Sequence, residues 1–188
     1  ISTSRTTAYG TVVPVTAKVV LGGATAPQAG VAAEWVVAPG GLASTSTAAA
    51  ATSSAGTSTR NVTVKRTTKV TYTAPASGVL GPCSTTVTYT VVPTLTTSLS
   101  STSVSRGGSF SVKAALSKPA AASEPLVVQR RSGTSWVSVT TGRTGSTGLK
   151  TFSLKAPTKA GTYYYRVVHP ATVAYGARTG ATLKLVVR

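Results

Sequence analysis

The second half of the chain repeats the residue pattern of the first half at a spacing of about 95 residues. Gly10 precedes a segment, residues 13–19, in which every second residue is apolar, and Gly107 precedes a similar segment at residues 110–116. Alternation of apolar and polar residues with a period of two is typical of a β-strand that buries one face. The sequence therefore predicts two units built from the same order of strands.

Further pairs of strand-like segments recur in the same order in the two halves. They match residues 33–37 with 126–130, 62–64 with 152–154, 70–72 with 163–167, and 87–91 with 183–187. Short strands separated by turns that contain Gly, Pro and Ser, without helical periodicity, are typical of a β-sandwich. Because Pro93 ends the last strand of the first unit, the sequence predicts one domain at residues 1–93 and a second at residues 94–188.

The composition favours strands over helices. Ser and Thr supply 58 of the 188 residues, and the branched side chains of Val and Thr fit a pleated sheet better than a helix. Residues 43–58 are low in complexity, and we expect strand or loop there because a short alanine run does not offset the cost of helix nucleation. No apolar run approaches the roughly 18 residues of a membrane-spanning helix, so membrane insertion is not expected.

A set of residues in the second half resembles a known family. The set comprises the segment at 125–131, Trp136, Gly148 and the segment at 160–167. These residues are similar to bacterial immunoglobulin-like repeats of exported actinobacterial proteins, and the resemblance covers residues 94–188 well and residues 1–93 more loosely. It implies an all-β protein of two tandem immunoglobulin-like antiparallel β-sandwiches, secreted or exposed at the cell surface. Such repeats serve as spacers, adhesin stalks, appendage subunits and accessory modules of enzymes.

Three aromatic residues have expected places in this fold. Tyr163 follows Gly161 at the position of a tyrosine corner, in which the phenol hydroxyl bonds back to the backbone. Val70 stands at the matching place in the first domain. Trp35 and Trp136 are expected to be core residues, one in each domain, because a buried Trp near the third strand is usual in such sandwiches. The alternative for either Trp is an exposed platform that stacks on a sugar ring.

The chain lacks the side chains that hydrolytic chemistry and metal binding require. It has one His, His169, and two acids, Glu34 and Glu124, and it contains no Asp. A Ser-His-acid triad is not expected, and the two Glu fall in separate predicted domains, so they do not form a carboxylate pair for glycoside cleavage. Calcium and zinc sites need more carboxylate, His or Cys ligands than the chain offers. The sequence predicts a non-enzyme without cofactor or metal, in which His169 has a structural or surface role.

Positive charge is the strongest functional signal. The 19 Lys and Arg face only two Glu, which gives a net charge of +17, with +5 on residues 1–93 and +12 on residues 94–188. Basic chains attract anionic partners, here wall polymer, acidic polysaccharide or neighbouring subunits, whereas nucleic acid is disfavoured because stacking aromatics are scarce. The residues expected to contact anions are Arg130, Arg131, Arg143, Lys150, Lys155, Lys159, Tyr164, Arg166 and Lys184. The competing interpretation is a charged outer face that only keeps the protein soluble.

Two functions fit these observations. The first is a non-catalytic structural and adhesive segment of a bacterial cell-surface protein or extracellular appendage, which contacts anionic envelope material or partner surfaces. The alternative is an accessory module that holds a secreted enzyme on polysaccharide or wall polymer through Lys and Arg. Binding that weakens steeply as salt rises separates an anion-binding module from a spacer.

Two features bear on assembly. Cys83 has no partner for an intrachain disulfide, so it is either a buried small residue or an exposed thiol that pairs between chains. In the alignment of the halves, the counterpart of residues 94–98 lies before residue 1, so the first domain is expected to miss most of its opening strand. Either the chain is a piece of a longer array, or a strand from another subunit completes the sheet. In the second case residues 1–7 are the expected donor, in a homopolymer formed by strand exchange.

Overall fold

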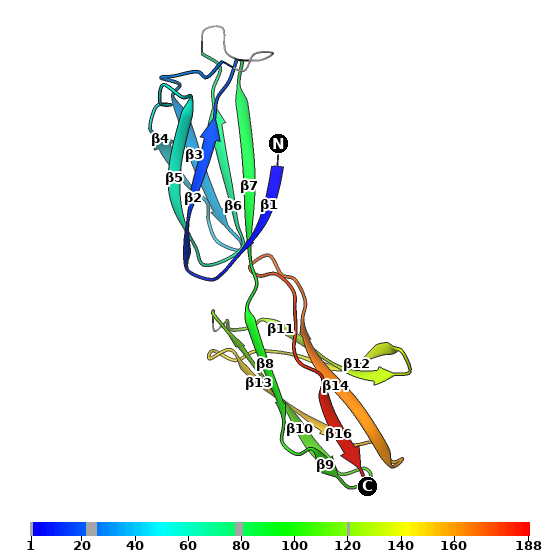
Figure 1. The fold of residues 1–188 in the computed structure, drawn as a ribbon. Helices are drawn as coiled ribbons and strands as arrows, with labels where there is room; N and C mark the ends of the chain where they lie inside the picture. Colours follow the sequence, from blue (N-terminus) through cyan, green and yellow to red (C-terminus); the bar gives the residue numbers. More distant parts are fainter. Residues whose placement is uncertain (1, 22–25, 78–80, 120) are drawn as a thin grey trace. The chain divides into compact units, whose positions relative to one another are not determined.

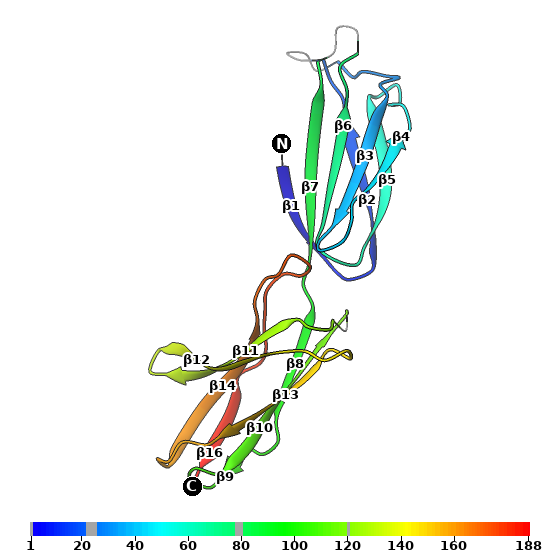
Figure 2. The same cartoon turned by 180° about the vertical axis from the view of Figure 1, so that it is seen from behind.

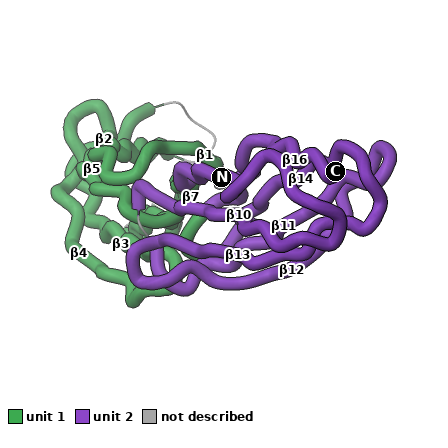
Figure 3. The backbone as a smooth tube through the Cα atoms, turned by 90° about the horizontal axis from the view of Figure 1, so that it is seen from below, with its two compact units in different colours: residues 1–92, 173–175 green, residues 93–172, 176–188 purple. Residues whose placement is uncertain are grey.

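The computed structural model describes residues 2–21, 26–77, 81–119 and 121–188, so Ile1 of the expected donor segment lies outside the described residues. Every regular element in these residues is a β-strand, which confirms the predicted all-β class. They divide between two compact units, shown in Figure 3: unit 1 is Ile1–Val92 with Val173–Tyr175, and unit 2 is Pro93–Thr172 with Gly176–Arg188. No helix in the described part of the chain has the length and apolar character needed to cross a membrane.

Unit 1 is a β-sandwich of two sheets. Its strands are β1 (Ser2–Thr7), β2 (Thr11–Lys18), β3 (Ala33–Pro39), β4 (Thr45–Ala49), β5 (Thr57–Val64), β6 (Thr68–Ala74) and β7 (Cys83–Val91). One sheet has the strand order β1-β7-β6-β3-β4, and the other consists of β2 and β5 (Figure 1). Val15 and Ala17 of β2 and Val62 and Val64 of β5 are buried, as the period-two pattern of apolar residues predicts.

Unit 2 is a β-sandwich of the same kind. Its strands are β8 (Thr94–Leu99), β9 (Ser103–Val104), β10 (Ser109–Ser117), β11 (Pro125–Ser132), β12 (Ser135–Arg143), β13 (Leu149–Lys155), β14 (Gly161–His169), β15 (Arg178–Thr179) and β16 (Leu183–Val187). One sheet has the order β13-β10-β8, and the other has the order β12-β11-β14-β16-β9, with β15 paired to β14 (Figure 2). Apart from their first strands, the main strands of the two units therefore follow one plan, as the repeat in the sequence predicts.

Each core contains one pair of aromatic rings in edge-on contact. In unit 1 the Trp35 and Tyr72 ring centroids lie 4.8 Å apart, and in unit 2 those of Phe110 and Tyr165 lie 5.3 Å apart. Trp35 is only 3% exposed, which confirms its predicted place in the core. Edge-on packing places the positive edge of one ring against the negative face of the other, so each pair adds to the stability that burial alone provides.

The two units differ at the edge where their first strands lie. In unit 2, β8 runs antiparallel to β10, and the short β9 runs parallel to β16. In unit 1, β1 runs parallel to β7 over six residue pairs, so it takes the place of β9. Among the described residues, no strand pairs with the second edge of β2, which is the place that β8 takes in unit 2.

In each sandwich a buried Thr side chain makes hydrogen bonds to the loop before the third strand. In unit 1 the Thr52 hydroxyl donates to the Gln28 carbonyl at 2.6 Å and accepts the Val31 backbone N–H at 2.9 Å. In unit 2 the Thr144 hydroxyl donates to the Ala121 carbonyl at 2.5 Å and accepts the Glu124 backbone N–H at 3.0 Å. Because buried backbone groups need partners, each Thr fixes where the strand begins. The role of these two Thr residues was not predicted from the sequence.

The tyrosine corner predicted for the second domain is present. The Tyr163 hydroxyl donates to the backbone carbonyl of Lys159 at 2.9 Å, four residues upstream. This bond holds the loop before β14 against the start of that strand. By contrast, the hydroxyl of Tyr72 is buried in unit 1, and no described residue provides a hydrogen-bond partner for it. The two phenols therefore contribute differently to their units.

Substituting phenylalanine for each of these tyrosines is expected to separate the two cases. Tyr163→Phe removes one hydrogen bond and should lower the free energy of unfolding of unit 2 by about 1 kcal/mol. Tyr72→Phe removes an unpaired buried hydroxyl, so the stability of unit 1 should stay unchanged or rise. Denaturant unfolding of both variants, followed by hydrogen exchange in each unit, provides the measurement. A loss above about 1 kcal/mol in Tyr72→Phe would contradict the absence of a partner.

Candidate anion-binding face

The structure brings four of the nine expected anion-contacting residues together on the outer face of one sheet in unit 2. They are Arg131 of β11, Tyr164 and Arg166 of β14, and Lys184 of β16, and Trp136 of β12 joins them. We call these five residues the aromatic-basic face. The inner face of the same strands carries the buried residues Val128, Tyr165 and Leu185 of the core.

The hairpin between β11 and β12 brings Trp136 to this face. Its loop is two residues long, because Ser132 pairs with Ser135, and Gly133 adopts a positive φ of 60° that suits such a tight turn. Residues directly opposite each other in an antiparallel pair share a face, so Trp136 lies beside its partner Arg131. The prediction that Trp136 is a core residue is therefore wrong: its side chain is half-buried on the outer face.

Arg166 of β14 contacts side chains of the neighbouring strands β11 and β12 on the aromatic-basic face. Its Nε donates to the Gln129 side-chain oxygen at 2.8 Å, and Gln129 is also its cross-strand partner on β11. Its guanidinium carbon lies 4.3 Å from the centroid of the Trp136 ring, in the geometry of a cation–π contact. These contacts hold the guanidinium over the ring, and both side chains are half-buried, so part of each is open to solvent.

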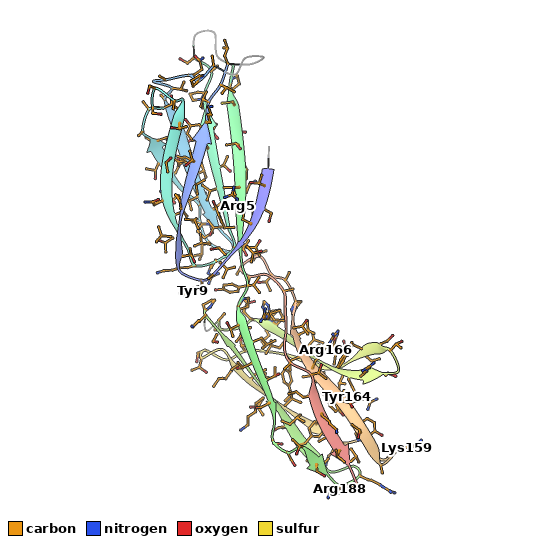
Figure 4. The ribbon with its side chains drawn as sticks, in the orientation of Figure 1. Arg5, Tyr9, Lys159, Tyr164, Arg166 and Arg188 are labelled. Atoms are coloured by element: carbon orange, nitrogen blue, oxygen red, sulfur yellow. The ribbon has the colours of Figure 1, made fainter. Side chains whose placement is uncertain are left out.

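Tyr164 and Lys184 extend the aromatic-basic face across the next strand. They are direct partners in the pairing of β14 with β16, so their side chains lie on one face. Strands β11 and β14 pair antiparallel from Val127 with Val168 to Arg130 with Tyr165. Arg131 and Tyr164 are the next residues along the two strands. Figure 4 shows Tyr164 and Arg166 on β14. Tyr164 is 36% exposed and Lys184 is exposed, so both present polar groups to solvent.

The other expected contact residues lie elsewhere in unit 2, and the side chains of Arg130, Arg143 and Lys150 have local contacts there. Arg130 is opposite the buried Tyr165, and it opposes part of the rise in the Tyr165 pKa that burial causes. Arg143 donates to the Ser123 carbonyl at 2.6 Å, and the Lys150 ammonium lies 5.7 Å from the centroid of the Phe152 ring. Lys155 is exposed on β13, and the Lys159 carbonyl accepts the Tyr163 hydroxyl.

A buried His–Glu pair is the feature that the sequence least revealed. His169 is 0% exposed, and its Nε2 lies 2.9 Å from Oε2 of Glu124, whose side chain is 14% exposed. The Thr172 hydroxyl donates to the same carboxylate oxygen at 3.2 Å. Of the two roles predicted for His169, structural or surface, the structure shows the structural one, because the side chain is buried in the core. The pair joins the residue before β11 to the end of β14.

Acidic, His and Cys side chains, which bind metal ions, are sparse in the described part of the chain. Residues 2–21, 26–77, 81–119 and 121–188 contain no group of three or more His, Cys, Asp or Glu that is close enough to hold a metal ion. Cys83 is a free and exposed thiol at the start of β7, so of its two expected placements the exposed one is found. The aromatic-basic face is thus the main concentration of binding side chains that we identify.

Strand order assigns both units to one class of fold. In unit 2, the first, second and fifth main strands form one sheet, and the third, fourth, sixth and seventh form the other, with a tyrosine corner at the start of the sixth. This arrangement is that of the immunoglobulin-like β-sandwich. The chain is therefore a tandem pair of immunoglobulin-like β-sandwiches.

Comparison with known proteins gives similarity at the level of structure. No protein-family model matches the sequence, and no curated protein matches it. A tetra-tandem repeat from the extending region of a large adhesion protein is similar with a TM-score of 0.54 and 13% identity, over 94% of this chain and 50% of that one. The chain thus spans about half the length of that structure. At this identity the similarity shows a shared fold.

Two other solved structures match nearly the whole chain. The adhesin InvE of Yersinia pseudotuberculosis matches with a TM-score of 0.49 and 12% identity, over 97% of this chain and 56% of that chain. The N-terminal four immunoglobulin domains of Dscam1 isoform 8.4 match with a TM-score of 0.47 and 12% identity, over 100% of this chain and 44% of that chain.

Proposed function

We propose that the chain is a non-catalytic, structural and adhesive segment of a bacterial cell-surface protein or extracellular appendage, and that unit 2 contacts anionic polymer through the aromatic-basic face. One observation carries the proposal. In a chain of net charge +17, three cationic side chains lie on one sheet face with two aromatic rings. An exposed sheet face of this kind suits an extended polyanion better than a small ligand in a cleft.

The charge pattern supports an anionic polymer as the partner. The second half of the chain holds +12 of the net +17, and the only acid of unit 2, Glu124, is paired with His169. No carboxylate therefore offsets the cations of the aromatic-basic face. Teichoic-acid-like phosphodiester polymers and uronic-acid polysaccharides of a bacterial envelope carry the matching negative charge. The proposed location is accordingly the outside of the cell.

The test removes two charges from the aromatic-basic face and retains Arg166 and Trp136; it also removes the hydrogen bond that the Arg131 Nε donates to the Gly133 carbonyl at 3.1 Å. Arg131→Gln combined with Lys184→Gln takes away two exposed cations and should weaken binding to a glycerol-phosphate polymer on the order of 10-fold at low salt. Lys65→Gln combined with Lys69→Gln removes the same charge from exposed positions in unit 1 and should change the affinity far less. Equal effects of the two double variants would show that net charge alone drives the binding.

The half-buried Trp136 favours a second function, a polysaccharide-binding accessory module. An indole ring that is partly open on a sheet face can stack on a sugar ring, whether or not the sugar is charged. Trp136→Ala should then weaken binding to a neutral glucan and to a polyanion alike. If the protein binds only the polyanion, and raised salt releases it steeply, the adhesive anion-contacting function is the better one.

A further inference from the structure

Two arginines adjoin Trp136 on the aromatic-basic face. Arg131 is the direct partner of Trp136 in the pairing of β11 with β12, so the two side chains lie on one face of the hairpin. Arg166 reaches the same indole from β14, with its guanidinium carbon 4.3 Å from the ring centroid. Two cationic side chains from different strands therefore adjoin one aromatic ring.

Each of the two arginines is held in place through its Nε. The Arg166 Nε donates to the Gln129 side-chain oxygen at 2.8 Å, and the Arg131 Nε donates to the Gly133 carbonyl at 3.1 Å. A guanidinium group has five N–H donors, so four on the terminal nitrogens remain in each side chain. No described residue accepts a hydrogen bond from these terminal nitrogens. Both arginines thus keep their terminal N–H groups available to a ligand.

The local charge favours a bound anion beside Trp136. Cations that adjoin one another repel, and a counter-charge between them lowers the free energy. The protein supplies none here, because the one acid of unit 2, Glu124, is paired with the buried His169. The terminal N–H groups of arginine bind the two oxygens of a carboxylate or of a phosphate with similar geometry. The rest of the face therefore has to select between these anions.

The aromatic rings select a sugar as the carrier of the anion. Trp136 is half-buried and Tyr164 is 36% exposed, so both rings keep surface open to solvent. The C–H groups of a pyranose ring pack on aromatic surface, whereas a glycerol-phosphate chain has no ring to pack there. Tyr164 also has a cation beside it, because Lys184 is its cross-strand partner. Each ring thus lies next to a cation, which is the combination that an acidic sugar requires.

We propose that the aromatic-basic face binds a polyuronate, a polysaccharide whose carboxylates are carried on pyranose rings. Arg131 and Arg166 bind one carboxylate through their terminal N–H groups, and the open part of the Trp136 ring contacts the sugar that carries it. Tyr164 and Lys184 bind another sugar of the same polymer. This ligand class narrows the anionic polymer of the function proposed above and rests on that function.

The test compares two oligomers of equal charge on the full chain, a galacturonate tetramer and a glycerol-phosphate tetramer. The galacturonate tetramer should bind about ten-fold more tightly, because both oligomers satisfy the cations but only one packs on the rings. Raised salt should weaken both oligomers, whereas the ratio of their affinities should persist because ring packing is not screened. An uncharged galactose tetramer should bind about ten-fold more weakly than the galacturonate tetramer at low salt.

Conservative variants separate the arginine donors from simple charge. Arg131→Lys and Arg166→Lys keep the positive charge but remove the planar set of donors, so each should weaken the galacturonate tetramer about five-fold. Arg106→Lys makes the same exchange at an exposed position outside the face and should bind within about two-fold of the unchanged chain. Trp136→Leu should weaken the galacturonate tetramer and change glycerol-phosphate binding far less.

The indole N–H signals in a nuclear magnetic resonance spectrum provide a readout that needs no variant to fold. The chain has two Trp residues, of which Trp35 is 3% exposed in the core of unit 1 and Trp136 is half-buried on the face. The galacturonate tetramer should shift the Trp136 signal of the unchanged chain and leave the Trp35 signal in place. The Trp35 signal therefore serves as the internal control.

The outcomes that overturn the polyuronate differ from those that overturn the proposed function. Equal or tighter binding of the glycerol-phosphate tetramer excludes the polyuronate and leaves an anion-binding face. Absence of binding by both charged tetramers at millimolar concentration overturns the ligand and the function together. If Arg131→Lys and Arg166→Lys bind like Arg106→Lys, or if the Trp136 signal does not shift, the two arginines and this indole are not the carboxylate site.

Discussion

Replacing Trp35 with alanine is expected to unfold unit 1 at ordinary temperature or bring it close to unfolding, with a loss of about 3–5 kcal/mol of stability. The Trp35 side chain is 3% exposed and packs edge-on against Tyr72 at 4.8 Å between ring centroids. Its removal leaves a cavity in the core of unit 1, and a sandwich of fewer than 100 residues has a small free energy of unfolding. Hydrogen exchange resolved by unit measures the effect, because only amides of unit 1 should lose protection.

Trp136→Ala is the matched control for Trp35→Ala. This side chain is half-buried on the outer face of unit 2, and its main partner is the Arg166 guanidinium at 4.3 Å. Loss of a cation–π contact at a surface costs about 1 kcal/mol or less. Equal losses in the two variants would mean that Trp136 is also a core residue. Fluorescence does not suit this comparison, because each variant removes one of the two indoles.

Removing the Glu124 carboxylate is expected to destabilise unit 2 by about 1–3 kcal/mol. In Glu124→Ala the fully buried Nε2 of His169 loses its partner at 2.9 Å, and the Thr172 hydroxyl loses the same acceptor. A buried polar group without a partner costs its full desolvation energy, which exceeds the net gain of an ordinary hydrogen bond. Chemical denaturation of the full chain, with hydrogen exchange at β11 and β14, measures the loss.

Two further variants identify the cause of that loss. Glu124→Gln keeps a polar group within reach of His169, so it should recover part of the stability. Glu34→Ala removes the other acid of the chain, which is exposed on β3, and should change stability by less than about 0.5 kcal/mol. A loss in Glu34→Ala equal to that in Glu124→Ala would attribute the effect to net charge and not to the buried pair.

Much of the fold follows from residue patterns over short distances. The alternation of Val15 and Ala17 with polar residues predicted a strand with one buried face, and both residues are in the core. The repeat between the halves predicted a second sandwich with the same strand plan, because similar patterns in similar order bury similar faces. Gly161 and Tyr163 likewise predicted the tyrosine corner, since that motif is local to one loop.

The candidate site was predictable only in part. The excess of positive charge pointed to the second half of the chain, and Tyr164 and Arg166 were among the residues predicted there to contact anions. The pattern around Trp136 did not say which of its two faces would be buried. The β11–β12 hairpin decided that question, because its register places Trp136 opposite Arg131 on the outer side.

The sequence by itself determined the all-β class, the repeated sandwich and the excess of positive charge, because these depend on composition and on periods of a few residues. Only the tertiary structure decided which distant residues meet. The antiparallel pairing of β11 with β14 brings Glu124 next to His169, although 45 positions separate them in the chain. Strand pairing likewise decided that β1 lies on β7 and that, among the described residues, β2 pairs with β5 alone. Contacts of this kind depend on register and on sheet order, which the identities of the residues in one strand do not specify.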